Sequence, residues 1–147
     1  MINLHDYLNV GQNAIVQRVV KASDATTQFS SPFKDLLATP TLLLWAIDAS
    51  VDAVDSYLPE GYASIGLSIN FVHTAPTSVG MTVTTHVSII DITEHDVLLS
   101  IKAWDEQGEI GHGTLKRAIV EKDSILNKAK ERSKMISSRR ILNLAKQ

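Results

Sequence analysis

The chain has 147 residues, of which 44% are hydrophobic and 20% are charged, as in an ordinary folded protein with one domain. Cysteine is absent, which excludes disulfides, thiolate metal ligands and a cysteine nucleophile. The longest uncharged apolar stretch, residues 36–47, is too short to span a bilayer, and residues 1–6 have no signal-peptide character. We therefore expect a cytoplasmic protein of one domain that does not bind membranes.

The charge is distributed unevenly along the chain. Residues 121–147 carry eight basic and three acidic side chains, whereas the other 120 residues carry 6 basic and 13 acidic ones. A basic tail of net charge +5 therefore follows a body of net charge −7. Such a tail either docks its solvated helix face on the acidic body or meets a separate anion.

The first half of the chain predicts one strand and one long helix. Val and Ile are frequent in residues 10–20, which favours a strand, and the polar residues 22–35 favour a loop. A helix is expected to begin with Thr39 as its N-cap and Pro40 at its first position, and to stop at residues 59–61. Its apolar stripe has helical spacing, and a second, polar face carries three aspartates. The stripe comprises Leu44, Ile47, Val51, Val54 and Leu58, and the polar face comprises Asp48, Asp52 and Asp55.

The periodicity then changes to that of strands. Four strands are predicted over residues 62–72, 81–92, 96–105 and 111–120, and their short connections favour antiparallel neighbours. Helical spacing returns from Asp123. This order of elements predicts an α+β fold in which a sheet wraps around a central helix, with a core over about residues 10–122 and a helical tail over 123–147. One sheet on one helix leaves an edge and apolar surface uncovered, so we expect a homodimer.

Common catalytic and binding motifs are missing from the sequence. It contains no G-x-S-x-G, no P-loop and no G-x-G-x-x-G. The five histidines lack metal-ligand spacing, and the aromatic residues are not interleaved with basic ones as in a single-stranded nucleic-acid platform. We expect neither a metal site nor a nucleic-acid partner.

Several short strings at consistent spacing instead resemble a known family. They are A-T-P at 38–40, V-H-T-A-P at 72–76, V-G-M-T-V at 79–83, W-D-E at 104–106 and G-H-G-T-L-K-R at 111–117. Over roughly residues 10–130 the chain resembles hotdog-fold thioesterases of the fluoroacetyl-CoA thioesterase type. The resemblance implies a hotdog fold and a homodimer, which could assemble further into a tetramer. It also implies an acyl-CoA ligand in a cleft at the dimer interface, with coenzyme A as part of the substrate and no separate cofactor.

The resemblance also implies which residues are catalytic. Thr39 and His73 match the threonine and histidine of the family's site, but the carboxylate expected eight residues after the threonine is Ile47 here. Asp48 is the next residue, about 100° around the helix and in register with Asp52. Asp48 is therefore either a displaced catalytic carboxylate or a solvated residue.

The histidine and threonine each have a structural interpretation as well as a chemical one. Thr39 is either a simple N-cap or part of an oxyanion site with the N–H groups from Thr41 onward. His73 is either a packed strand residue or a general base.

Three further positions match the family's substrate contacts. Gly66 would give a thioester room to approach, or it marks a strand bulge. Arg117 would pair with an oxygen of CoA, or it is a surface charge at a strand end. Phe33 is either an aromatic lid near the acyl group or an ordinary buried residue.

Three functions follow from these observations. The first is hydrolysis of a short or medium acyl-CoA. The second is acyl-CoA binding without turnover, because Ile47 replaces the carboxylate. The third assigns the basic tail to oligomerisation or to anion binding.

Overall fold

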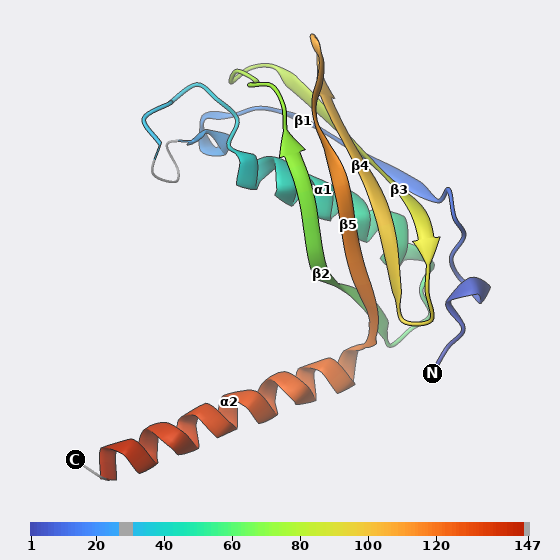
Figure 1. The fold of residues 1–147 in the computed structure, drawn as a ribbon, viewed down its shortest axis with the longest axis vertical. Helices are drawn as coiled ribbons and strands as arrows, with labels where there is room; N and C mark the ends of the chain where they lie inside the picture. The colour runs from blue at the N-terminus through green and yellow to red at the C-terminus, as the bar shows by residue number, and fades with distance from the viewer. Residues whose placement is uncertain (27–30, 146–147) are drawn as a thin grey trace.

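The computed structural model describes residues 1–26 and 31–145 and confirms the predicted α+β class. A five-stranded antiparallel sheet wraps around one long helix, and a second helix extends from the end of the sheet (Figure 1). The elements are β1 (Asn13–Val19), α1 (Thr39–Val54), β2 (Tyr62–His73), β3 (Thr82–Ile92), β4 (Asp96–Asp105), β5 (Gly108–Glu121) and α2 (Lys122–Ala145). Residues 27–30 of the predicted loop lie outside the described residues.

The core lies between the inner face of the sheet and one side of α1. Strand residues of one parity are buried, such as Val83, Val87 and Ile89 in β3. The facing side of α1 is formed mainly by Leu42, Trp45 and three fully buried alanines at positions 46, 49 and 53. Because these alanines are small, the helix can lie close to the curved sheet.

The predicted apolar stripe of α1 is therefore wrong in part. Val54 is buried, but Leu44 is 54% exposed, and Ile47 and Val51 are only half-buried. The bulky apolar residues predicted the wrong side of α1 as the buried one, because the helix packs its small residues against the sheet. Leu44, Ile47 and Val51 form an outer apolar strip on α1 that is exposed or half-buried.

The strand order also differs from the sequence prediction. The order in the sheet is β1-β3-β4-β5-β2, so β2 pairs with β5 and not with β3. The connection between β2 and β3 does not make a tight turn, because it bonds to the segment before α1. β2 is consequently an edge strand, and its residues 66–70 are exposed.

The start of α1 is shifted by one residue from the prediction. Ala38 is the N-cap and Thr39 is already helical. The N–H of Ala38 donates to the carbonyl of Asp24 at 2.9 Å, which holds Ala38 in an extended conformation. The Thr39 side chain is thus not used for capping and can bind another group.

The helix α2 leaves the body at the end of β5, as the change in periodicity predicted. Of its described side chains only Ile125 is half-buried, and the others are exposed. Figure 1 shows α2 projecting away from the sheet, beyond the β2 edge. Within residues 1–26 and 31–145, no helix combines the length and the apolar character that crossing a membrane requires.

Candidate active site

Thr39 and His73 lie side by side although 34 residues separate them in the sequence. Thr39 begins α1 and His73 ends β2, and Thr39 Oγ1 lies 2.8 Å from His73 Nδ1. They share a pocket of about 270 Å³, which is lined by Thr26, Leu36, Leu37, Thr39, His73, Thr74, Ala75 and Pro76. The structure therefore brings together the two residues that the sequence predicted as catalytic.

The surroundings of His73 favour its neutral form. Burial lowers the pKa of the imidazole below its ordinary value of 6.5, and the backbone of Ala75 opposes this to a smaller extent. Nε2 is buried and has no hydrogen-bond partner among the described residues. In the tautomer that carries its proton on Nε2, Nδ1 accepts a hydrogen bond from the Thr39 hydroxyl. At neutral pH, His73 can therefore accept a proton.

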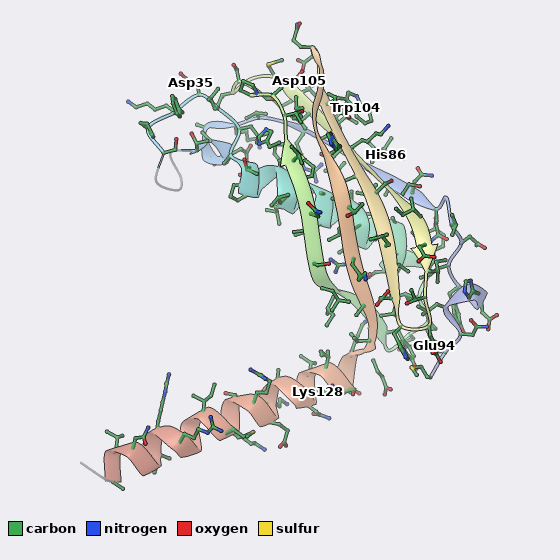
Figure 2. All side chains as sticks on the ribbon, viewed as in Figure 1. Asp35, His86, Glu94, Trp104, Asp105 and Lys128 are labelled. Carbon is green, nitrogen blue, oxygen red and sulfur yellow. The ribbon has the colours of Figure 1, made fainter. Side chains whose placement is uncertain are left out.

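A set of hydrogen bonds fixes the two segments that carry this pair. The Leu37 N–H donates to the carbonyl of Thr77 at 2.8 Å, and the Val79 N–H donates to the carbonyl of Asp35 at 2.8 Å. The fully buried Thr77 hydroxyl donates to Asp105 at 2.8 Å, which anchors the segment to the end of β4. Figure 2 shows Asp35 and Asp105 at the end of the molecule where α1 begins.

The sequence contained a signal for this anchor without revealing its role. Asp105 belongs to the W-D-E string that contributed to the family resemblance, and its other carboxylate oxygen accepts the N–H of Gln107 at 2.8 Å. A buried carboxylate that closes a strand turn and bonds a distant loop could not be placed without the topology.

The backbone donors predicted for an oxyanion are already engaged. The N–H groups of Thr41 and Leu42 both donate to the carbonyl of Ala38, at 3.1 and 3.2 Å. The first turn of α1 therefore satisfies them internally, and the expectation that they are unpaired is wrong. The polar residues of the pocket lining are Thr39 and His73 together with Thr26 and Thr74.

Asp48 does not reach the pair within one chain. It lies exposed on α1, nine residues after Thr39, which corresponds to about 13.5 Å along the axis and half a turn around it. Ile47, at the position of the missing carboxylate, is about 12 Å along the same axis. In the single chain neither side chain is next to His73.

Gly66 and Arg117 lie together at the other end of β2. They are paired across β2 and β5, and Gly66 is seven residues from His73, or about 23 Å along the strand. A register shift follows Gly66, which confirms the predicted bulge.

Arg117 is buried and turned inward. It donates to the Ser64 hydroxyl at 2.7 Å and to the Ser64 carbonyl at 3.0 Å, and Ser64 in turn bonds Asp55. Burial lowers the pKa of the guanidinium, and the nearby Asp55 carboxylate raises it to a smaller extent. The interpretation of Arg117 as a surface charge at a strand end is therefore wrong. The expectation that Arg117 binds the substrate stays a prediction.

Phe33 is exposed rather than packed in the core. Its side chain is 60% exposed, and its carbonyl accepts a hydrogen bond from the Thr26 hydroxyl. The interpretation as an ordinary buried residue is thus wrong. Phe33 lies in the segment that leads to Leu36 and Leu37 of the pocket, and a lid role stays a prediction.

Two glycines of the G-H-G string have a structural role that the sequence did not reveal. A Cβ at Gly113 would collide with the backbone of Asn70, and one at Gly111 would overlap the ring of Phe71. Only glycine lets β5 approach β2 this closely, just before His73.

Among residues 1–26 and 31–145, no group of three His, Asp or Glu side chains is placed to hold a metal ion.

Comparison with known proteins agrees with this geometry. Residues 20–123 match the family described as fluoroacetyl-CoA-specific thioesterases. The chain belongs to this family. A fluoroacetyl-CoA thioesterase of Streptantibioticus cattleyicolor is 30% identical over 101 residues, which cover 69% of this chain and 73% of that protein.

Solved structures confirm the hotdog fold expected for a thioesterase of this family. A hot-dog-like protein from Thermanaerovibrio acidaminovorans is 27% identical, with a TM-score of 0.84 over 89% of this chain and 97% of that one. A variant of the fluoroacetyl-CoA thioesterase FlK in complex with acetyl-CoA is also 27% identical, with a TM-score of 0.79 over 85% and 98% of the two chains. Acyl-CoA thioesterase-like function is thus supported for this chain.

Proposed function

We propose that the protein hydrolyses short or medium acyl-CoA thioesters, as a cytoplasmic homodimer whose cleft includes the pocket at Thr39 and His73. The observation that carries this proposal is the contact of 2.8 Å between the Thr39 hydroxyl and Nδ1 of the half-buried His73, whose pKa burial lowers. Membership of the thioesterase family supplies the reaction class, and a related thioesterase has been solved with acetyl-CoA.

The chemistry follows from the proton that His73 can accept. The attacking oxygen is Thr39 Oγ1 or a water in hydrogen-bond reach of Nδ1, and its proton goes to His73 as the C–O bond forms. The C–S bond then breaks, and the departing thiolate takes the proton to give free coenzyme A. If Thr39 attacks, water releases the acyl group in a second step with His73 again as base. The final products are a carboxylic acid and coenzyme A.

The shape and lining of the pocket support a small acyl group. Its apolar wall comes from Leu36, Leu37, Ala75 and Pro76, and its volume of about 270 Å³ is at the low end for small-molecule sites. A short acyl chain is therefore the better fit, and the exposed Phe33 is placed on the segment that leads into this wall.

Two features support pairing of two copies. The edge strand β2 has unpaired backbone groups and exposed apolar side chains, namely Leu67, Ile69 and Val72. α1 carries the outer apolar strip as well. Antiparallel pairing of two β2 edges would bring the first half of β2 in one copy beside the His73 end of β2 in the other, and so place the pocket next to the dimer interface.

The test is release of free thiol from a panel of acyl-CoAs by the purified protein. His73→Ala is compared with His112→Ala, because His112 is an exposed histidine that pairs with Glu109 on the surface. We expect His73→Ala to lose about 10²- to 10⁴-fold in kcat and His112→Ala to retain its rate. Equal rates in both variants would overturn the proposal. Binding of acyl-CoA without thiol release would overturn hydrolysis and favour the non-catalytic binding module.

A further inference from the structure

The helix α2 is exposed along most of its described length and is strongly basic. Between Lys122 and Ala145 it contains seven basic and two acidic side chains. Several of its apolar side chains are more than half exposed, including Leu126, Met135 and Ile141. Most helices gain their stability from tertiary packing of one face. We therefore expect the exposed helix α2 to pack against another surface.

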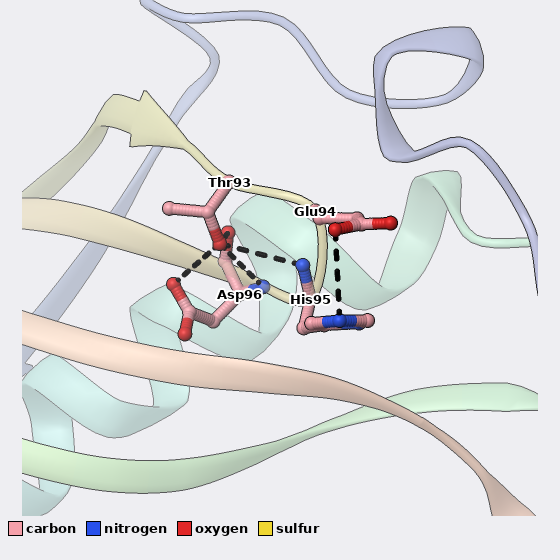
Figure 3. Close-up of polar contacts among 4 residues, drawn as sticks. All are labelled: Thr93, Glu94, His95 and Asp96. Atoms are coloured by element: carbon pink, nitrogen blue, oxygen red, sulfur yellow. Dashed lines mark hydrogen bonds and ion pairs between the residues drawn. The ribbon is translucent and has the colours of Figure 1, made fainter.

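One side of α2 faces the body at its root. Ile125 and Lys128 line a cavity of about 290 Å³ together with Glu94 and His95 of the turn between β3 and β4. Figure 3 shows this turn, in which the Thr93 hydroxyl bonds the Asp96 carboxylate at 2.9 Å and accepts the Asp96 N–H at 3.0 Å. These hydrogen bonds fix the conformation of the turn. The side of α2 that carries Ile125 and Lys128 therefore faces a rigid part of the body.

Helical spacing extends this side beyond the body. Arg132 is one turn further along than Lys128, so it lies on the same side of α2. Lys130 and Lys134 lie roughly 120–160° around the helix from Lys128, on the side that faces away. The helix thus carries two basic pairs of equal charge on opposite sides. Lys128 and Arg132 form one pair, and Lys130 and Lys134 form the other.

The position at which α2 begins determines what lies beside Lys128 and Arg132. Glu121 pairs with Tyr62, and the Lys122 N–H donates to the carbonyl of Gly61 at 2.9 Å, so α2 begins next to the first residue of β2. His73 is the last residue of β2. In an antiparallel pair centred on the exposed residues 66–70, the first residue of one β2 lies opposite the last residue of the other. Figure 1 shows α2 running past the β2 edge, the edge at which we propose that a second copy pairs.

We propose that α2 is an arm that lies across the pocket mouth of a second copy, where Lys128 and Arg132 bind the phosphates of coenzyme A. This inference rests on the proposed function, because it needs two copies paired at β2 and an acyl-CoA in the pocket. The pantetheine chain separates the phosphates from the thioester, so the phosphates belong outside the small pocket, on the surface. The body has a net charge of −7 and is a poor surface for a polyanion, whereas the arm supplies the missing cations.

The central experiment compares two charge-matched double variants, Lys128→Gln/Arg132→Gln and Lys130→Gln/Lys134→Gln. Calorimetry gives the Kd for coenzyme A, and kinetics give KM for acetyl-CoA and for S-acetyl-N-acetylcysteamine, a thioester without the nucleotide. We expect the first variant to weaken coenzyme A binding and raise the KM for acetyl-CoA, each by about tenfold, and to leave the N-acetylcysteamine thioester unaffected. The second variant should change none of these values by more than about twofold.

A mixing experiment tests whether the arm acts on the other copy. Chains with His73→Ala, which keep an intact arm, are mixed with Lys128→Gln/Arg132→Gln chains, which keep an intact pocket. If the arm reaches across, mixed dimers contain one complete site, and the low KM of the unmodified protein returns. If the KM stays high after mixing, the arm does not serve the second copy and the proposal is wrong.

The failures of the two proposals can be told apart. Equal effects of both double variants on coenzyme A binding, or no effect of either, would overturn the arm whether or not the protein hydrolyses thioesters. A loss that is equally large with S-acetyl-N-acetylcysteamine would also overturn it, because that substrate has no phosphate. Absence of thiol release with both substrates would instead refute the proposed function, and the coenzyme A affinities would still decide the role of the arm.

Discussion

The two ends of β2 hold polar groups in opposite states. At the Arg117 end, the buried guanidinium, Ser64 and Asp55 form a closed chain of hydrogen bonds. At the His73 end, one imidazole nitrogen contacts the Thr39 hydroxyl and the other is buried with no partner among the described residues. Satisfied buried groups stabilise a fold, whereas groups with unused hydrogen-bonding capacity next to a pocket are available for chemistry.

We infer from this difference that the His73 end of the strand is the reactive one. The network around Arg117 joins the end of α1 to β2 and β5, and it leaves little free for a ligand. The Thr39–His73 end is instead held by contacts one step away, through Thr77 and Asp105.

After His73→Ala, the largest effect is expected from removing the hydroxyl that contacts His73. Thr39→Val should lower kcat for acyl-CoA by about 10²-fold, because it removes a polar group aimed at the reacting centre, whereas Thr39→Ser should retain most of the rate. Mass spectrometry of the protein during turnover distinguishes the two attacking oxygens, since an acyl adduct on Thr39 forms only if Thr39 is the nucleophile. Full activity of Thr39→Val would show that the Thr39 hydroxyl has no role in catalysis.

The next effect concerns the anchor behind the reactive end. Thr77→Val keeps the side-chain shape but leaves the buried Asp105 without its hydroxyl donor, which should cost about 1–3 kcal/mol of stability. We also expect kcat to fall about tenfold with little change in KM, because the segments carrying Thr39 and His73 are no longer fixed. Thermal melting and steady-state kinetics measure the two effects. An unchanged kcat would show that the anchor serves stability alone.

A change at the other end should affect stability and not turnover. Arg117→Lys loses the paired donors to Ser64 and should lower the free energy of unfolding by about 1–3 kcal/mol, with KM and kcat within about twofold. Denaturant unfolding gives the first value. A marked rise in KM for acyl-CoA at unchanged stability would instead support the predicted role of Arg117 in substrate binding.

The smallest effect is expected from restoring the missing carboxylate. Ile47 is half-buried on the outer strip of α1, so glutamate can be accommodated there. If this strip meets a second copy's pocket, Ile47→Glu should raise kcat by about two- to tenfold. Thiol release with Leu44→Glu as control tests this, since Leu44 is on the same strip. No gain, or an equal gain in both variants, would count against the alignment that places Ile47 at the carboxylate position.

Much of the fold was accessible from the sequence because its signals are local. Strand alternation and the Thr-Pro helix start gave the elements to within a few residues. The pairing of β2 with β5 was not accessible, because it depends on a connection that bonds the distant segment 35–37 instead of turning. The inward side of α1 was missed for a related reason, since three alanines carry less hydrophobic signal than Leu44, Ile47 and Val51.

The site was accessible only in part. Thr39 and His73 were predicted from matching strings, and their contact confirms that they are neighbours. The burial of Arg117, the engaged N–H groups of Thr41 and Leu42, and the anchor at Asp105 all depend on packing between segments far apart in sequence. No local pattern encodes such packing.

The most direct test of the central claim is the titration of His73 itself. NMR would follow its imidazole while kcat/KM for an acyl-CoA is measured across the same pH range. Burial lowers the pKa of His73, so the folded protein binds the imidazole proton less well than the unfolded chain does. His73 is therefore neutral and able to accept a proton at neutral pH. Activity should be full there and should fall as the pH drops below 6.5 and the imidazole becomes protonated. We expect the imidazole to titrate below 6.5 and the acid limb of kcat/KM to have the same midpoint. An imidazole that titrates above 6.5, or a limb with a different midpoint that persists in His73→Ala, would contradict it.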